Sequence, residues 1–404
     1  MSRLGRTYLI VVVASLLAVA IVPAVAGAQS NNTYVVATNG NDNARGDVNA
    51  PLRTIEAGVS RLKPGDTLLV RGGDYSSPSG PDAPIDINGL RATAAQQVRI
   101  ANYPGERPVR HGSGWQVFRV FNSTYITIEG FEIVGTALTD HSPTAGVEVN
   151  ESNHIAVLGN VIHDTGGSGV SAIHSDDIRV QGNQIWGTTK WSEFQTSAIN
   201  FFESVDSNTG PGLFGYNNHI VGNLVYKNET LVPGPEGLIT DGNCIIIDSN
   251  RSRGYTGATA ILNNICVGNG GRGVNVNRSD HVLVVNNTLS GDVNHVDQPA
   301  AELNATYASD VVFRNNLVSP NRADRALILF DAQNISTDSN VYVASNPSQM
   351  GPGDQVVASL PLFLGSIPGA GSPAVDAGNT DRAPTIDLFG NPRHGRPDAG
   401  AVER

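Results

Sequence analysis

The chain has 404 residues, of which 16 % are charged, where soluble domains usually carry about 25 %. Glycine is frequent, at 45 residues, and this composition argues against coiled coils and long surface helices. The 26 basic and 37 acidic side chains give a net charge of −11. That charge repels a polyanion such as DNA, so we expect no nucleic-acid partner, although a local basic cleft for an acidic sugar is compatible with it.

The first residues have the pattern of an export signal. Arg3 and Arg6 precede an apolar run over residues 8–22, and the small residues 26–28 follow it. The run is shorter than the roughly 20 residues needed to cross a bilayer. We therefore predict that residues 1–28 are a signal peptide cleaved after Ala28, and that the mature protein is secreted and has no membrane contact.

The segment after this leader combines strand patterns with one short helix pattern. Residues 34–37 are strand-like, and Ile55, Val59 and Leu62 stand at positions i, i+4 and i+7, the spacing of one apolar helix face. We expect this helix to cover one open end of the structure that follows.

Short apolar runs that lead into an asparagine then recur along the chain. Successive asparagines are 23 to 41 residues apart, which a unit of 23 residues with insertions explains. Periods of about 20–50 residues are typical of solenoids. The recurring residues are Asn160, Asn183, Asn223, Asn264, Asn287, Asn316 and, more weakly, Asn340.

The repeats are built from strands. Segments such as 146–150 and 273–277 alternate β-branched and polar residues, which is a period of two. The asparagine fits an inward turn position, where side-chain amides stack and hydrogen-bond from one coil to the next. The pattern predicts an all-β solenoid that forms one domain.

The chain resembles the secreted right-handed parallel β-helix proteins over nearly all of its mature length. The resemblance implies a β-helix over residues 29–345 with an N-terminal helical cap, followed by an irregular C-terminal capping segment over residues 346–404. The segments 372–378 and 397–403 are similar to the closing segment of those proteins. A solenoid with both ends covered has little need to associate, so we expect a monomer.

The chain has two cysteines, Cys244 and Cys266, each in a strand-like segment of one repeat. They either form a disulfide, which an oxidising compartment favours, or remain two buried thiols.

Three insertions, at residues 135–145, 187–197 and 228–242, fall at the same point of the repeat. We expect them to stack and to wall one side of a groove, with outward strand residues as its floor. Amide-rich and aromatic side chains there suit a sugar chain. The floor has two predicted columns, Glu148, Ser171, Asn200, Ile246, Asn275 and Asn150, Ile173, Phe202, Asp248, Asn277. The residues that we expect to bind substrate are Asn200, Phe202, Asn275, Asn277, Trp191 and Glu203.

The segments 240–248 and 269–275 are similar to two segments of the family-nine pectate lyases. This resemblance implies β-elimination on an acidic polysaccharide such as pectate, with calcium held by acidic residues and with a lysine as base. Asp241 matches the first calcium-binding acid, whereas Gly271, Arg272 and Asn275 stand at the other three positions. Calcium prefers several oxygen ligands. Our hypothesis is that Arg272 binds a uronate carboxylate without metal.

The base has few candidates, because Lys63, Lys190 and Lys227 are the only lysines of the chain. Lys190 and Lys227 lie on or beside the groove insertions, so either could reach the substrate. The candidate catalytic residues are Asp241, Asp248, Arg272, Lys190 and Lys227.

Two other functions remain open. Hydrolysis needs two carboxyl groups about 5–9.5 Å apart. Asp241 and Asp248 meet only if the turn at residues 242–243 folds back, and Asp248 with Glu203 or Glu148 is the better pair. The adjacent His163 and Asp164 should point to opposite faces of a strand. A non-catalytic carbohydrate-binding protein would use the same groove.

Overall fold

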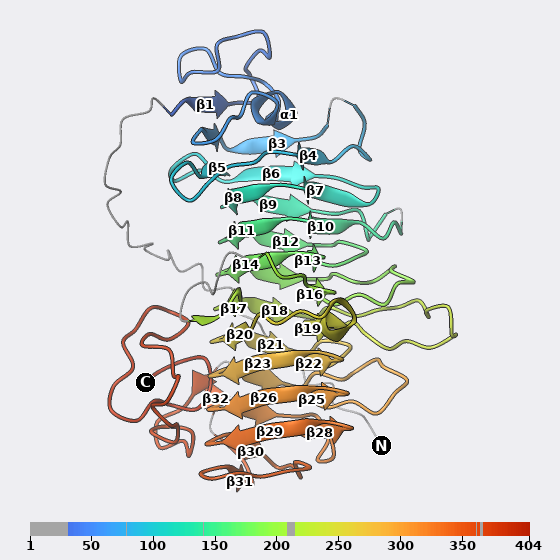
Figure 1. Cartoon of the computed structure of the whole chain (residues 1–404), viewed down its shortest axis with the longest axis vertical. Helices are drawn as coiled ribbons and strands as arrows, with labels where there is room; N and C mark the ends of the chain where they lie inside the picture. The colour runs from blue at the N-terminus through green and yellow to red at the C-terminus, as the bar shows by residue number, and fades with distance from the viewer. Residues whose placement is uncertain (1–30, 78, 140, 208–214, 361, 364–366) are drawn as a thin grey trace, which may run out of the picture.

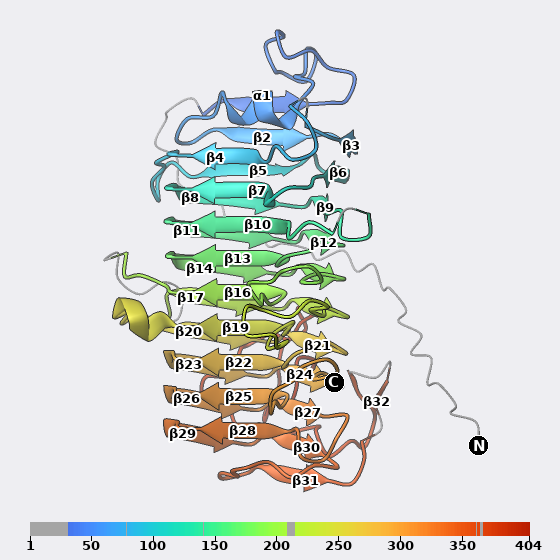
Figure 2. The same ribbon diagram turned by 90° about the vertical axis from the view of Figure 1, so that its right-hand side faces the viewer.

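The computed structural model describes residues 31–77, 79–139, 141–207, 215–360, 362–363 and 367–404. The predicted signal peptide, residues 1–28, lies outside this range. Almost every described strand belongs to one of three parallel sheets, and each coil of the chain visits them in the order I, II, III (Figures 1 and 2). The predicted parallel β-helix is thereby confirmed. Among the described residues, no helix is long and apolar enough to cross a membrane.

Sheet I has nine strands and sheets II and III have eleven each within the described residues. Sheet I consists of β4 (Ile85–Asn88), β7 (Gln116–Phe121), β10 (Ala145–Asn150), β13 (Val170–Ile173), β16 (Ile199–Phe202), β19 (Ile245–Asp248), β22 (Val274–Asn277), β25 (Leu303–Thr306) and β28 (Leu327–Phe330). Sheet II consists of β1 (Thr33–Val36), β2 (Thr67–Val70), β5 (Val98–Asn102), β8 (Thr124–Glu129), β11 (Asn153–Leu158), β14 (Asp176–Gln181), β17 (Asn218–Val221), β20 (Thr259–Leu262), β23 (Asp280–Val285), β26 (Ser309–Arg314) and β29 (Gln333–Asp338).

Sheet III consists of β3 (Gly73–Tyr75), β6 (Pro108–His111), β9 (Glu132–Val134), β12 (Val161–His163), β15 (Gln184–Trp186), β18 (Leu224–Tyr226), β21 (Ile265–Val267), β24 (Thr288–Ser290), β27 (Leu317–Ser319), β30 (Val341–Val343) and β31 (Gln355–Val357). The other elements are the short helices α1 (Ile55–Val59) and η2 (Asn250–Arg253) and the antiparallel pair β32 (Leu362–Phe363) and β33 (Ile367–Pro368).

A buried asparagine ladder joins the coils at the corner between sheets II and III. It contains all seven asparagines of the sequence repeat. In each step the side-chain Nδ2 donates to the Oδ1 of the next asparagine, at 2.9–3.2 Å, and the ladder ends on Asp354. Each Nδ2 also donates to a backbone carbonyl of the preceding coil, such as that of Val157 for Asn183. The ladder therefore satisfies buried turn groups that no water could reach.

The residue before each ladder asparagine adopts a left-handed backbone, and its identity depends on what packs outside. Where the turn is glycine, as at Gly159 and Gly182, φ is +60° and +67°. Asparagine, which tolerates this conformation, replaces glycine in three later coils. There Asn263, Asn286 and Asn315 each donate a hydrogen bond of 2.8 Å to a carbonyl of the C-terminal segment.

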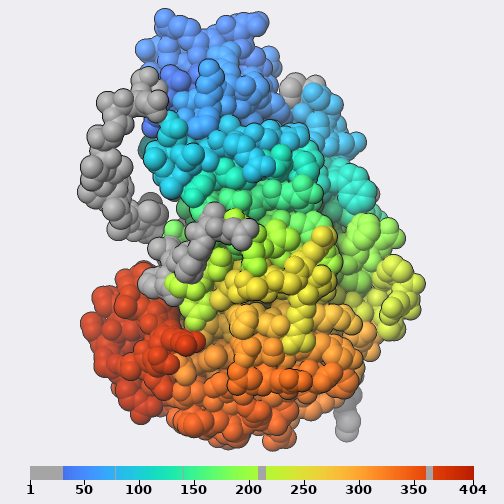
Figure 3. Space-filling model, viewed as in Figure 1, coloured from blue at the N-terminus to red at the C-terminus, as the bar shows by residue number. Residues whose placement is uncertain are grey.

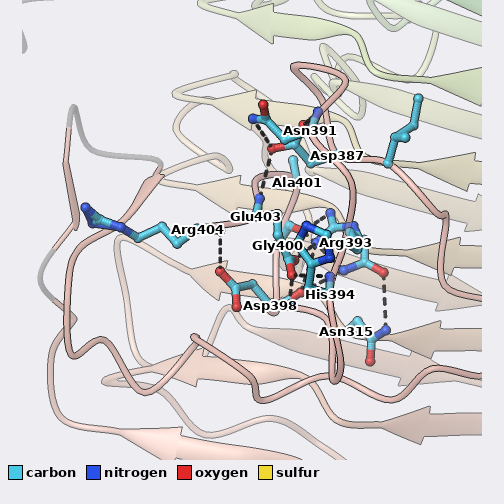
Figure 4. A network of polar contacts seen from close by, with 12 residues as sticks. Asn315, Asp387, Asn391, Arg393, His394, Asp398, Gly400, Ala401, Glu403 and Arg404 are labelled. Atoms are coloured by element: carbon cyan, nitrogen blue, oxygen red, sulfur yellow. Dashed lines mark hydrogen bonds and ion pairs between the residues drawn. The ribbon is translucent and has the colours of Figure 1, made fainter.

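The C-terminal segment lies along the side of the coil stack (Figures 1 and 3). Residues 346–354 pass across the last coil, where the Ser348 amide donates to the Leu327 carbonyl at 3.2 Å. Sheet III then gains β31, which lies beyond the boundary at residue 345 that the resemblance implies. Within the segment, Arg393 and Glu403 form an ion pair of 2.9 Å with side chains only 3 % and 5 % exposed (Figure 4).

At the other end of the stack, α1 packs on the first coils. Ile55 and Leu62 are buried in the core, and Val59 packs against it. The Thr54 side chain caps the helix by accepting from the Ala57 amide. The fully buried Arg110 reaches the helix from sheet III and forms an ion pair of 3.1 Å with Glu56.

Two carboxyl groups lie fully buried between coils, on Asp292 and Glu302. The Asp292 amide donates to Glu302 Oε1 at 3.0 Å. Burial raises the pKa of both carboxyls, and the charge of Asp292 raises the pKa of Glu302 further. At pH values between the ordinary carboxyl range and the raised folded pKa values, the folded pair therefore retains protons that the unfolded chain releases.

We predict that Asn264→Ala lowers the free energy of unfolding by about 2–5 kcal/mol. The variant removes the acceptor of the buried Asn223 backbone amide and the side-chain donor to the Ile220 carbonyl. Urea unfolding measures the change. The exposed Asn49→Ala is the control and should change stability by less than about 0.5 kcal/mol. Equal stability of the two variants would contradict the structural role of the ladder.

The buried acid pair gives a second prediction. Because both folded pKa values are raised, the free energy of unfolding should fall as the pH rises from the ordinary carboxyl range through the folded pKa of Glu302. Glu302→Gln keeps the hydrogen-bond acceptor for Asp292 but cannot ionise, so this loss should become smaller. Urea unfolding at about pH 5 and about pH 8 tests it, with the exposed Glu236→Gln as control. An unchanged pH slope in Glu302→Gln would refute the assignment.

Candidate functional site

The three predicted insertions lie side by side between sheets III and I and form one wall. The Trp191 indole Nε1 donates to the Ala137 carbonyl at 2.6 Å, and the Leu231 amide donates to the Lys190 carbonyl at 3.0 Å. A fourth segment joins them, since the Asp297 amide donates to the Ile239 carbonyl at 2.9 Å. The loops project from one side of the stack in Figure 1. The wall is thus bonded from coil to coil.

The strand registers of sheet I reproduce both predicted outward columns. In the second column Phe202 pairs with Asp248, and Asp248 pairs with Asn277. The inward column from Val147 to Val274 is fully buried.

The two outward columns differ in exposure. In the first column Ser171, Ile246 and Asn275 are buried, whereas Glu148 and Asn200 are half-buried. The Asn200 Nδ2 donates to the Ser171 hydroxyl at 3.2 Å. In the second column Phe202, Asp248 and Asn277 are half-buried. Around Asp248 the surface open to a ligand is therefore the strip formed by the second column. Figure 2 looks onto the strands of sheet I that carry it.

Asp248 lies at the centre of this strip, at the end of β19. Its Oδ1 accepts from Asn277 Nδ2 at 2.8 Å and from the Ser249 hydroxyl at 2.9 Å. Burial raises the pKa of Asp248 in spite of these two hydrogen bonds and of the positive charge of Arg278, and the charge of Glu203 raises it further. Asp248 can therefore hold a proton at a higher pH than an ordinary carboxyl group.

A charged network lies next to Asp248, one coil toward the N-terminus. Glu203 Oε2 accepts from Arg253 Nε at 2.8 Å and lies 3.0 Å from His174 Nε2. The hydrogen bond from Arg253 lowers the pKa of Glu203, and the bond from His174 lowers it further. The strip thus contains two neighbouring carboxyl groups whose pKa values move in opposite directions.

Asp241 lies in the third insertion, directly before Gly242, where φ is +84°. Its carboxylate accepts from Asn243 Nδ2 at 2.6 Å and from the Thr240 hydroxyl at 2.7 Å. Burial raises the pKa of Asp241, Arg272 opposes this rise, and the charge of Asp248 adds to it. The charges of Asp241 and Asp248 therefore act on one another, and their use as a hydrolytic pair stays a prediction.

Arg272 lies beneath the wall and is 7 % exposed. Its Nη1 donates to the Thr240 carbonyl at 2.7 Å and its Nη2 donates to the Pro299 carbonyl at 3.4 Å. The carboxylate clamp expected of Arg272 requires a guanidinium that faces the strip. In the structure, this guanidinium instead holds two insertions together.

Calcium does not fit this arrangement. Asp241 already accepts two hydrogen bonds and lies near the charge of Arg272, and Gly271 and Asn275 offer no carboxylate. No group of three or more His, Cys, Asp or Glu side chains suited to a metal ion occurs in the described part of the chain.

The remaining predicted residues lie around the strip. Lys190 is half-buried within the wall, whereas Lys227 is exposed at the end of β18 in sheet III. Of the described carboxylates, none forms an ion pair with either lysine. Glu148 is three strands from Asp248, about 14 Å at 4.8 Å per strand, which is too far for a hydrolytic pair. Trp191 stacks on His141, with centroids 3.9 Å apart.

The prediction for His163 and Asp164 is wrong. Their side chains meet, with His163 Nδ1 at 2.8 Å from Asp164 Oδ2. Asp164 lies past the end of β12 and has a φ of +53°, so the alternation of strand side chains no longer holds there. The pair lies on sheet III, where His163 stacks on Trp186 at 4.4 Å.

Sequence reasoning missed His174, Arg253 and Arg278. His174, Glu203 and Arg278 occupy the same left-handed turn position directly after a sheet I strand, with φ values of +47°, +49° and +44°. Extending the repeat alignment by one residue would have found this column. Arg253 is in η2, outside the repeat, and the alignment holds no signal for it.

Cys244 and Cys266 form a disulfide with their Cα atoms 5.8 Å apart. The bridge joins the start of β19 to β21 within one coil, so it ties the strand that ends in Asp248 to sheet III.

Comparisons with known proteins agree with this architecture. Residues 34–209 match the family described as Pel9A-like, right-handed β-helix region, and the match ends before Asp241 and Asp248. The crystal structure of pectate lyase Pel9A aligns over 94 % of this chain and 98 % of its own, with a TM-score of 0.55 and 16 % identity. The GH136 lacto-N-biosidase from Eubacterium ramulus aligns over 77 % of this chain and 60 % of its own, with a TM-score of 0.53 and 14 % identity.

These structural likenesses establish the right-handed β-helix fold. A search of curated protein sequences found no match.

We predict that Arg272→Ala lowers the free energy of unfolding by about 2–4 kcal/mol, because two carbonyls lose a buried charged donor. Chemical denaturation measures the change. Arg278→Ala removes an exposed guanidinium and should stay within about 0.5 kcal/mol of the parent protein. If Arg272→Ala were as stable as Arg278→Ala, the structural role of Arg272 would be excluded.

Proposed function

We propose that this protein is an extracellular enzyme that cleaves an acidic polysaccharide by β-elimination on the open strip of sheet I. The observation that carries the proposal is the half-buried Asp248 with its raised pKa, placed between Phe202 and Asn277. An aromatic ring and an amide beside an acid are groups that bind a sugar and act on its glycosidic bond.

In this reaction a base removes the proton next to the uronate carboxylate. The bond from the sugar to the glycosidic oxygen breaks, a carbon–carbon double bond forms, and the leaving oxygen takes a proton. Asp248 supplies that proton, since burial keeps its carboxyl protonated at a higher pH than usual. Asn277 orients the carboxyl through its hydrogen bond to Oδ1.

The base is assigned to Lys190, which lies in the wall, or to Lys227, which directly precedes the third insertion. Arg278 is exposed beside this strip, and its positive charge acts on Asp248. Calcium takes no step in this proposal, since the residues around Asp241 do not fit it.

Hydrolysis is a second candidate, favoured by the opposite pKa shifts of two neighbouring carboxyls. Asp248 would protonate the glycosidic oxygen, and the ionised Glu203 would act as base or nucleophile. The Glu203 amide donates to the Asp248 carbonyl at 2.9 Å, so the two residues lie on adjacent coils.

The test is incubation with polygalacturonate, alginate and glycosaminoglycans. We expect ultraviolet absorbance from an unsaturated uronate to appear with at least one polymer, and the rate to be unchanged by EDTA. New reducing ends without that absorbance would establish hydrolysis instead. Binding without either product would identify a non-catalytic carbohydrate-binding protein.

The matched variant for this assay is Asp248→Asn. The rate should fall by at least about 100-fold, the range for loss of a general acid.

Since burial penalises the ionised carboxyl, the stability of Asp248→Asn near neutral pH should be unchanged or higher. The parent activity should decline as the pH rises through the folded pKa of Asp248. Glu151→Gln changes an exposed acid at an equivalent turn and should retain activity. Full activity of Asp248→Asn would refute its assignment as proton donor.

A further inference from the structure

The open strip continues past Asp248 to two exposed aromatic rings at the C-terminal end of sheet I. The column runs in register from Asp248 through Asn277 and Thr306 to Phe330. Three strand spacings of about 4.8 Å place Phe330 about 14 Å from Asp248 along the stack. A chain of sugar units that lies along this column and reaches Asp248 can therefore extend to Phe330.

Tyr307 stands beside Phe330 at the left-handed turn after β25, where φ is +51°. The two rings meet edge to face, with centroids 5.4 Å apart. Phe330 is 56 % exposed and Tyr307 is 37 % exposed. Most large aromatic side chains of the coil interior, such as Phe118, Phe201 and Phe313, are fully buried. The rings of Tyr307 and Phe330 are thus accessible to a ligand, whereas the aromatic rings of the core are not.

Arg278 adds positive charge to the same surface. Its guanidinium carbon lies 5.3 Å from the centroid of the Tyr307 ring, and the residue is exposed. The neighbouring Arg251 is neutralised by Asp280, at 2.6 Å. In the described part of the chain, by contrast, Arg278 forms no ion pair with a carboxylate. A carboxylate can therefore still bind to it.

We propose that Arg278, Tyr307 and Phe330 form a distal subsite that binds a uronate unit of the polysaccharide cleaved at Asp248. The sugar ring stacks on the aromatic pair, and its carboxylate binds the guanidinium. This subsite rests on the proposed function for its substrate, but it predicts binding whether or not cleavage follows. It would act on affinity and on the length of chain that is recognised.

The charge and geometry favour a sugar over a protein partner. The aromatic surface consists of two rings only, and it continues the polar strip of Asn277 and Thr306 in register. Both rings project from strand ends of a rigid sheet, so little conformational entropy is lost when a ligand binds. Stacking on aromatic faces together with a guanidinium matches the alternating apolar face and carboxylate of a uronate.

The test uses Asp248→Asn as background, so that binding is measured without turnover. Affinity for polygalacturonate, alginate and a glycosaminoglycan is measured by isothermal titration calorimetry. We expect binding to at least one of these polymers. Adding Tyr307→Ala and Phe330→Ala together should weaken it roughly tenfold. Arg278→Gln should weaken it and reduce its dependence on salt, whereas Arg278→Lys should restore part of the affinity.

Phe389→Ala is the matched control, because Phe389 is an exposed phenylalanine of the C-terminal segment, away from the strip. It should leave the affinity unchanged, and thermal unfolding should show that all variants remain folded. If the variants at Tyr307 and Phe330 bound as tightly as Phe389→Ala, or if no acidic polymer bound at all, the subsite would be refuted. If the polymers bound through these residues but the parent protein cleaved none, the proposed function would fail and the subsite would stand.

Discussion

The buried hydrogen bonds between turn asparagines are the constraint on which the rest of the structure depends. Every coil of a solenoid places backbone groups at corners that water cannot reach, and an unsatisfied group there costs about 1–3 kcal/mol. The ladder from Asn160 to Asn340 satisfies these groups by side-chain to side-chain and side-chain to backbone bonds. It also favours one register, because a slip of one residue in the coils with Gly159, Gly182 and Gly222 would remove the asparagine from the buried corner.

The register of the strands also determines which side chains become neighbours at the candidate site. Phe202, Asp248 and Asn277 lie far apart along the chain, yet they are neighbours on sheet I because their strands are aligned coil by coil. Strand positions are more rigid than loop positions, which suits groups that must be held at a fixed separation. The insertions have a different role from that of the strands. They enclose Arg272, whose guanidinium donates to the Thr240 and Pro299 carbonyls.

The same repeat also explains how the C-terminal segment is held. Three consecutive coils have asparagine at the left-handed turn position, and each of these side chains donates to a backbone carbonyl of the segment. Arg393 of the segment reinforces the contact, because its Nη2 donates to Asn263 Oδ1 at 2.9 Å. The residue before the ladder asparagine therefore adopts the left-handed turn and, where it is asparagine, also binds the C-terminal segment.

The sequence by itself determined the fold class, the ladder asparagines and both outward columns of sheet I. These follow from local periodicity, because the alternation of apolar and polar residues and the recurring turn asparagine favour one register for the stacked strands. Only the tertiary structure decided which column stays open, that Arg272 is enclosed, and that Glu203 meets His174 and Arg253. Exposure and pKa depend on what insertions from other coils place over a residue, and no periodic pattern within one coil contains that information.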